Sequence, residues 1–131
     1  MKRSPQVVWI TDADQPTGKA LIRRWAKDGA HLLLSSPSNG IEIAAEINLA
    51  KASGSKVLVS NVDLSSGTNA NELVLQAERE LGALQVLIHN HDLFVPFSVE
   101  AGSEALFREV IHTNAKSACL CTQAAGKVMA A

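Results

Sequence analysis

The apolar positions of this chain alternate between the period of buried strands and the period of amphipathic helices. Residues 6–11 and 30–35 are short apolar runs, which predict two strands. Between these runs the apolar positions recur at i, i+3, i+4 and i+7, which predicts a helix with one buried face. These positions are Gly18, Leu21, Ile22 and Trp25. The sequence Asp28-Gly29 predicts the end of this helix, because glycine readily adopts the conformation of a C-terminal cap.

The same alternation continues to the end of the chain. Helical spacing predicts helices over residues 40–52 and 69–81, and apolar runs predict strands over residues 56–62 and 84–90. A last, long helix is expected from Glu104 to the C-terminus, with Ser103 as its N-terminal cap. Its apolar stripe contains Phe107, Val110, Ile111, Asn114 and Ala118.

Strands and helices that alternate at this spacing predict right-handed βαβ units. We therefore expect an α/β fold, a Rossmann-like doubly wound parallel sheet with helices on both faces. No linker rich in Pro, Gly or Ser interrupts the pattern, so residues 1–131 are expected to form one domain.

Composition excludes several classes of partner. The chain has 131 residues, 47% of them hydrophobic and 19% charged, with a net charge of -1. Because Lys and Arg are scattered, we expect neither nucleic acid nor a membrane surface as a partner. The apolar run at residues 7–10 is too short for a signal peptide or a spanning helix. Cys119 and Cys121 point to different faces of a predicted helix, so no disulfide is expected and a reduced, cytoplasmic setting fits.

Residues 11–18 lie between the first strand and the first helix, where nucleotide-binding α/β proteins place a glycine-rich phosphate loop. Only Gly18 is a glycine. Asp12 and Asp14 are expected to lie within several ångströms of phosphate oxygens and to repel them, and Pro16 offers no N–H. The alternative is that these residues serve the helix start, because aspartate and proline both favour that position.

The order of these segments resembles the short-chain dehydrogenase/reductase family over essentially the whole chain. Residues 11–18 fall on the family's Thr-Gly-x-x-x-Gly-x-Gly loop, and residues 18–30 are similar to its first helix. The Asp63-Leu64-Ser65 segment matches its acidic position after the third strand. Residues 81–92 resemble the stretch that ends in Asn-Asn-Ala-Gly, and residues 114–123 resemble the family's fifth-helix signature. The resemblance implies a strand order of 3-2-1-4 in a truncated form of the fold.

The resemblance also implies roles for individual residues. Asp63 would hold the adenine amino group, Asn90 would support the central strand near the cofactor, and Asn114 would be the asparagine of the catalytic tetrad. By position, Thr11, Gly18 and Ser36 would join the cofactor site. The Ser, Tyr and Lys of the tetrad have no counterpart here, and the sequence contains no tyrosine to act as general acid.

Each of these residues also has an alternative interpretation. Ser36 follows the second strand where the family carries Asp for NAD or Arg for NADP, and it can equally be a solvated turn serine. Asp63 can equally be a helix N-cap residue. A metal site at His89, His91 and Asp92 lacks a clear further ligand, so we expect none. Cys119 and Cys121 are expected to fill the core.

Two functions follow from these observations. The first is a non-catalytic domain that serves as an interaction or oligomerisation subunit, with no cofactor bound. Its partner would be a second copy, or an intact dehydrogenase subunit, docked on the 104–131 helix and the edge of the fourth strand. The alternative is the N-terminal cofactor-binding part of an NAD(P)-dependent oxidoreductase, with its Ser/Tyr/Lys part missing or supplied by another chain. A neutral or cationic small molecule is a third, weaker possibility.

Overall fold

The computed structural model describes residues 5–90 and 104–130, which form a parallel sheet with helices on both faces. The strands are β1 (Val7–Ile10), β2 (His31–Ser35), β3 (Val57–Ser60) and β4 (Leu84–Ile88). Their order across the sheet is β3-β2-β1-β4, and every neighbouring pair is parallel. The expected fold class and strand order are therefore confirmed.

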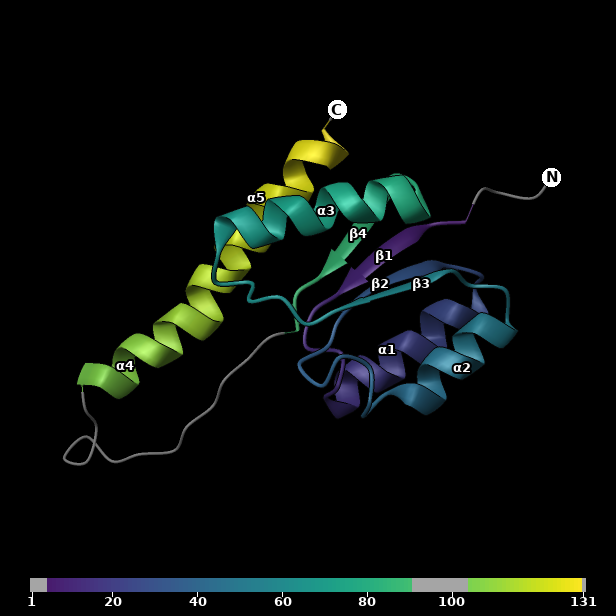
Figure 1. Cartoon of the computed structure of the whole chain (residues 1–131), viewed down its shortest axis with the longest axis horizontal. Coiled ribbons are helices and arrows are strands. Elements are labelled where there is room, and N and C mark those ends of the chain that lie inside the picture. The colour runs from purple at the N-terminus through teal and green to yellow at the C-terminus, as the bar shows by residue number, and fades with distance from the viewer. Residues whose placement is uncertain (1–4, 91–103, 131) are drawn as a thin grey trace.

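Two helices cover each face of the sheet (Figure 1). On one face lie α1 (Pro16–Lys27) and α2 (Ala44–Ala52), and on the other lie α3 (Gly67–Leu81) and α5 (Ser117–Met129). Alternate residues of β1 face the two layers, because side chains along a strand point to opposite sides. Val7 and Trp9 join the core under α3 and α5, whereas Val8 and Ile10 join the core under α1 and α2.

Several element boundaries differ from the prediction, among them the end of β4 at Ile88 and not Asn90, and the start of α3 at Gly67 and not near Asn69. The second helix begins at Ala44 and not near Gly40, because Asn39 and Gly40 have φ angles of 53° and 91°, which are incompatible with a right-handed helix. The third strand is shorter than predicted and ends at Ser60, where the chain leaves the sheet. The first helix ends as predicted, with Gly29 at a φ of 78° immediately after its last turn.

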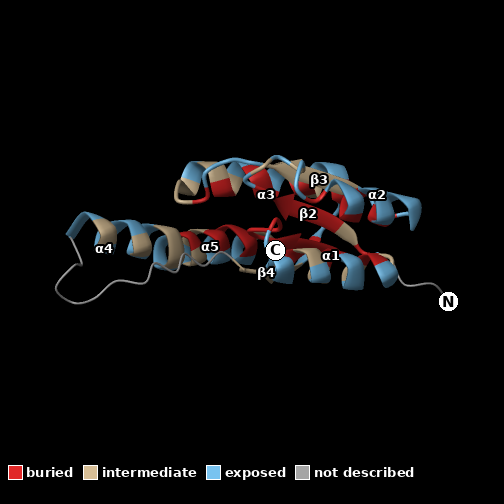
Figure 2. Ribbon diagram, turned by 90° about the horizontal axis from the view of Figure 1, so that it is seen from below, coloured by how far each residue is buried: buried red, intermediate tan, exposed pale blue. Residues whose placement is uncertain are grey.

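The last helical segment is divided into three parts. They are α4 (Glu104–Ile111), a π-helical turn η1 (His112–Lys116) and α5. The predicted cap Ser103 lies outside the described residues. No residue of the predicted apolar stripe is buried, because Phe107 and Ile111 are 61% and 46% exposed and Val110, Asn114 and Ala118 are of intermediate burial. Figure 2 shows that α4 extends away from the sheet and carries exposed and intermediate residues only.

The two cysteines differ in environment. Cys121 is fully buried in the core under α3 and α5, as predicted, and burial raises the pKa of its thiol to about 12. Cys119 is exposed, so its predicted place in the core is wrong. A two-residue step along a helix turns the side chain by roughly 200°, which separates the two thiols. Both are free, in agreement with the prediction of no disulfide.

Candidate functional site

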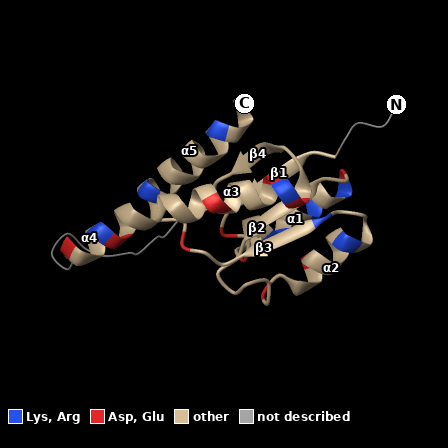
Figure 3. Ribbon diagram, turned by 45° about the horizontal axis from the view of Figure 1, so that its top comes forward, with Lys and Arg blue, Asp and Glu red and all other residues tan. Residues whose placement is uncertain are grey.

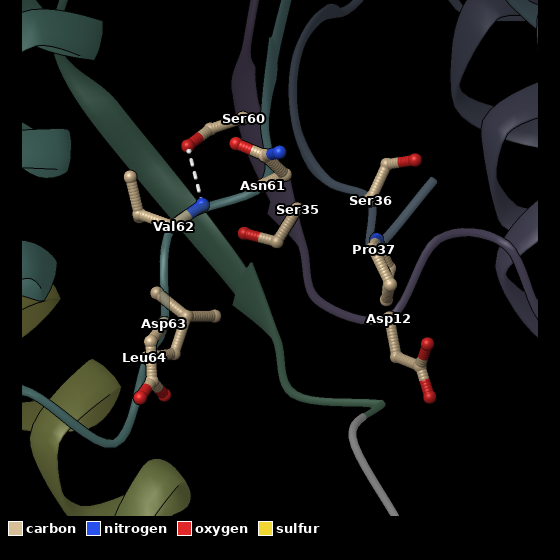
Figure 4. A pocket seen from close by; sticks show the side chains of 9 residues that line it. All are labelled: Asp12, Ser35, Ser36, Pro37, Ser60, Asn61, Val62, Asp63 and Leu64. Carbon is tan, nitrogen blue, oxygen red and sulfur yellow. Dashed lines mark hydrogen bonds between the residues drawn. The ribbon is translucent and has the colours of Figure 1, made fainter. Parts of the chain in front are cut away.

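A small cavity lies at the carboxyl ends of β1, β2 and β3, with a volume of about 110 Å³. Ligands of open α/β sheets bind at this end of the strands. Figure 4 shows residues that follow β1 and β2 on one side of the cavity and residues that follow β3 on the other. The lining residues are Asp12, Ser35, Ser36, Pro37, Ser60, Asn61, Val62, Asp63 and Leu64.

The loop after β1 keeps a glycine-like backbone although it has lost a glycine. Asp12 has a φ of 47°, in the left-handed region that glycine enters most easily and that Asp also tolerates. Pro16 occupies the start of α1, as the helix-start interpretation predicted. Neither aspartate occupies the N-cap position of this helix, which is Gln15, and the Gln15 side chain makes no capping hydrogen bond. The aspartates therefore lie near the helix start, as that interpretation expects, but outside the N-cap position.

Gly18 has a packing role in this loop. A Cβ atom at this position would lie 2.5 Å from the Ala13 carbonyl oxygen and 2.7 Å from its carbonyl carbon. Such contacts are far shorter than real Cβ atoms show, and the obstacle is backbone that cannot rotate away. Glycine therefore allows the first turn of α1 to lie directly against the loop that follows β1.

Hydrogen bonds from the end of β4 hold the loop in place. The Asn90 backbone N–H donates to Thr11 Oγ1 at 2.7 Å, and Asn90 Nδ2 lies 3.4 Å from the Asp12 carbonyl oxygen that accepts from it. His89 Nδ1 lies 3.4 Å from the same Thr11 hydroxyl. Thr11 is fully buried. Thr11 and Asn90, which the resemblance placed at the cofactor site, therefore meet beneath the loop.

Asp14 is held by the turn that follows β2. Ser36 Oγ donates to Asp14 Oδ1 at 2.6 Å, and the Ser38 backbone N–H donates to Asp14 Oδ2 at 2.9 Å. Ser36 Oγ also accepts from the Gly40 N–H at 2.8 Å. Ser36 is 1% exposed, so the prediction of a solvated turn serine is wrong. The carboxylate of Asp14 therefore links the loop after β1 to the turn after β2.

Asp63 stands on the opposite side of the cavity from Asp12 (Figure 4). Its Oδ1 accepts hydrogen bonds from Ser65 Oγ at 2.7 Å and from the Ser65 N–H at 2.9 Å. These two bonds lower the pKa of Asp63, the side-chain bond most strongly, and Lys116 and His112 lower it further. The N-cap of α3 is Ser66, which accepts from the Asn69 N–H, so the N-cap alternative for Asp63 is wrong.

The remaining site residues are divided between the cavity and other parts of the fold. Asn114 is half-buried in the π-helical turn η1 and does not line the cavity. Sequence reasoning missed Ser35, Ser60 and Asn61, which do line it. The Ser35 hydroxyl accepts from Trp9 Nε1 at 2.9 Å. Their position at strand ends was the available signal, because parallel strands bring their carboxyl ends to one edge of the sheet.

The described residues that line the cavity include two aspartates and neither Lys nor Arg. Lys116 and His112 nevertheless lie close enough to Asp63 to lower its pKa. Figure 3 shows basic and acidic residues interspersed over the described helices in that view. Among the described residues no three His, Cys, Asp or Glu side chains are grouped as metal ligands would be. His91 and Asp92, two of the three residues considered for a metal, lie outside the described residues.

Comparison with known proteins identifies relatives over nearly the whole chain. The family model described as "short chain dehydrogenase" matches residues 6–131. An uncharacterized oxidoreductase of Methylorubrum extorquens is 29% identical over 126 residues, 96% of this chain and 51% of that protein. A glucose 1-dehydrogenase of Gluconobacter oxydans is 30% identical over 89 residues, 68% of this chain and 34% of that protein. The chain spans about half the length of several of the curated relatives it matches.

Solved structures share the fold at lower identity. A short-chain dehydrogenase/reductase from Serratia marcescens has a TM-score of 0.86 and 22% identity, covering 95% of this chain and 51% of that one. A short chain dehydrogenase from Mycobacterium paratuberculosis, solved with NAD bound, has a TM-score of 0.86 and 20% identity over 95% and 50% of the two chains. In the part of the chain that the structure describes, no helix has the length and apolarity needed to cross a membrane.

Proposed function

Since this chain belongs to the short-chain dehydrogenase family, we propose that it is the cofactor-binding portion of an NAD(P)-dependent oxidoreductase. The adenosine end of the cofactor would bind in the cavity at the ends of β1, β2 and β3. One observation carries this proposal above all. The loop after β1 has a left-handed turn at Asp12, a close backbone contact between Gly18 and Ala13, and a hydrogen bond from Asn90 to the Asp12 carbonyl, although only one of its residues is a glycine.

The cavity suits the uncharged nucleoside better than the phosphates. Both Ser65 bonds end on Oδ1 of Asp63, so Oδ2 can accept a hydrogen bond from the adenine amino group. The lowered pKa of Asp63 keeps that acceptor ionised at neutral pH. Asp12, in contrast, places a carboxylate at the loop that would face the pyrophosphate. At an effective dielectric between water and a protein surface, such repulsion costs roughly 1–3 kcal/mol.

The chemistry of the reaction would come largely from groups beyond these residues. A bound nicotinamide supplies or accepts a hydride. The general acid that the family resemblance implies is a tyrosine, and these 131 residues contain none. Asn114 is the one tetrad position that the sequence matches. This chain would therefore contribute cofactor binding and orientation, and it would require another polypeptide segment for proton transfer.

A direct titration tests this proposal. NADH and NADPH are added to the protein while nicotinamide fluorescence and the midpoint of thermal unfolding are followed. We expect weak, saturable binding, with a gain of about 1.4 kcal/mol in unfolding free energy at tenfold excess over the dissociation constant. Asp63→Ala should weaken binding, and Glu80→Ala, which removes an exposed carboxylate from α3, should not. The proposal would be refuted if millimolar cofactor produced no fluorescence change and no thermal shift.

A second candidate function is that of an interaction subunit without a cofactor. It is favoured by α4, whose apolar side chains Phe107 and Ile111 are 61% and 46% exposed and which buries no residue. Exposed apolar faces of this kind are typical of interaction sites. Strand β4 also lies at the edge of the sheet. The occupant that we favour is a second copy of the chain, with an intact family member as the alternative.

Light scattering on a size-exclusion column distinguishes these cases. Self-association through α4 predicts a dimer or larger oligomer that Phe107→Asp dissociates. Leu75→Asp is the matched control, since Leu75 is 53% exposed on α3. An oligomer that resists the Phe107 change would contradict the α4 interface. A monomer at every accessible concentration would exclude self-association and leave a different family member as the partner to test by mixing.

A further inference from the structure

Asp14 places a negative charge at the turn after β2, although it belongs to the loop after β1. It is 8% exposed, and both of its carboxylate oxygens accept hydrogen bonds from that turn. The donors are Ser36 Oγ at 2.6 Å and the Ser38 N–H at 2.9 Å, which are 22 and 24 residues away in sequence. A short bond to an ionised acceptor is among the stronger hydrogen bonds in proteins.

These bonds occupy hydrogen-bond donors of the turn that could otherwise bind an anion. Ser36 Oγ has a single proton, which it gives to Asp14, and it accepts from the Gly40 N–H. The Ser38 N–H is likewise directed at Asp14. Donors that would otherwise be available to a phosphate group at this turn are therefore occupied by a carboxylate of the chain itself.

In dinucleotide-binding α/β folds, the region just after the second strand lies beside the adenosine ribose. An acidic side chain there accepts from the 2′-hydroxyl, and an arginine accommodates a 2′-phosphate. The turn after β2 in this chain has neither, because its sequence is Ser35-Ser36-Pro37-Ser38. Asp14 supplies the missing negative charge from a different loop.

We propose that Asp14, acting through Ser36 and Ser38, makes the site select an adenosine with a free 2′-hydroxyl and reject one that carries a 2′-phosphate. This inference rests on the proposed function, since it presupposes that the cavity holds adenosine. The site would therefore prefer NAD, which has a free 2′-hydroxyl, to NADP, which carries a 2′-phosphate. Asp14 is a positioning residue that acts on the ligand through the turn and by its charge.

The electrostatics of the cavity act in the same direction. A 2′-phosphate brings close to two negative charges near Asp14, and none of the described residues that line the cavity is a Lys or Arg that would compensate them. At an effective dielectric between water and a protein surface, repulsion over several ångströms predicts at least about a tenfold preference for the unphosphorylated ribose. The free 2′-hydroxyl carries no charge and avoids this repulsion.

The test compares adenosine with adenosine 2′-monophosphate by calorimetric titration at low salt. These ligands differ only in the 2′-phosphate, and neither carries the pyrophosphate of a dinucleotide. Wild-type protein should bind adenosine at least about tenfold more tightly. Asp14→Asn and Asp14→Ser should reduce this preference by strengthening binding of the 2′-monophosphate. Asp28→Asn, which removes an exposed carboxylate at the end of α1, should leave the preference unchanged.

The outcomes separate the inference from the proposed function. If wild-type protein binds both ligands equally, or prefers the 2′-monophosphate, the inference is refuted and the adenosine site stands. If neither ligand binds at millimolar concentration, the proposed function fails, and the inference fails with it. If both Asp14 variants unfold, which circular dichroism would show, the absence of a preference in the wild-type protein still refutes the inference.

Discussion

The backbone N–H of Asn90 donates a hydrogen bond to Thr11 Oγ1 at 2.7 Å, which joins the chain beyond β4 to the loop after β1. The acceptor is fully buried. Both residues flank strands that are neighbours in the sheet, and Thr11 N–H donates in turn to the Ile88 carbonyl. The shape of the loop at the candidate site therefore depends on a contact between segments that are 79 residues apart.

Thr11→Val should destabilise the protein. The substitution keeps the shape of the side chain but leaves the Asn90 N–H without its acceptor. Because this N–H is partly buried, we expect a cost near the lower end of about 1–3 kcal/mol. Urea unfolding followed by circular dichroism measures the difference. Thr11→Ser retains the hydroxyl and should lose less unfolding free energy than Thr11→Val. Thr122→Val, on the exposed side of α5, should leave the unfolding free energy nearly unchanged. Equal stability of Thr11→Val and the wild type would show that this bond does not support the fold.

Gly18→Ala should be strongly destabilising, because the added methyl group would lie 2.5 Å from a backbone oxygen. Overpacking of this kind typically costs about 1–3 kcal/mol. Gly126→Ala is the matched control, since a Cβ atom there meets nothing within 4 Å and the residue lies in a helix. That change should stabilise by about 0.5–1 kcal/mol. The account predicts opposite signs for the two substitutions in thermal unfolding, and the same sign for both would contradict it.

Asp12→Gly should tighten NADH binding by at least about fivefold, because it removes a carboxylate that would repel the pyrophosphate. It should also relieve the φ of 47°, which glycine adopts at lower cost. Asp12→Asn separates these effects, since it removes the charge and keeps a side chain that tolerates this conformation. Both variants should bind NADH more tightly if repulsion dominates. If only the glycine variant gains affinity, backbone shape and not charge limits binding.

The pKa of Asp63 should respond to Ser65. The folded-state pKa lies below the ordinary value of 3.8, chiefly because of the hydrogen bond from the Ser65 hydroxyl. A carboxyl group with a lowered pKa stabilises the fold above its unfolded pKa, and this stabilisation is lost as the pH falls through the folded value. Ser65→Ala should therefore raise the pKa of Asp63 in an NMR titration, and Ser53→Ala should not. An unchanged pKa in Ser65→Ala would exclude this hydrogen bond as the cause.

The sequence predicted the architecture because local patterns determine it. Four apolar runs separated by amphipathic helices leave few alternatives to a parallel sheet, since βαβ connections are right-handed. The family resemblance then supplied the strand order, which the structure confirms. The start of α2 was less predictable, because the left-handed conformations of Asn39 and Gly40 are set by tertiary contacts of the turn as well as by residue type.

The contacts at the candidate site were less accessible to sequence reasoning. Nothing local indicates that Asp14 bonds to Ser36 and Ser38, because these loops meet only after β1 and β2 have paired. The alternative of Asp63 as a helix cap failed for a local reason, because Ser66 stands three residues nearer to α3 and takes the cap position, while Asp63 accepts from Ser65. Helical spacing also predicted a continuous last helix, and it carries no signal for the π-helical turn η1.

The most direct test of the account is an NMR titration of isotopically labelled protein with adenosine. The central claim is that the cavity at the ends of β1, β2 and β3 binds the nucleoside end of the cofactor. It predicts saturable chemical-shift changes in the backbone amides that line this cavity, above all Ser36 and residues 60–64. The groove between α3 and α5, lined in part by Asn71 and Lys127, should stay unperturbed. Shifts confined to that groove, or no shifts at millimolar adenosine, would contradict the claim.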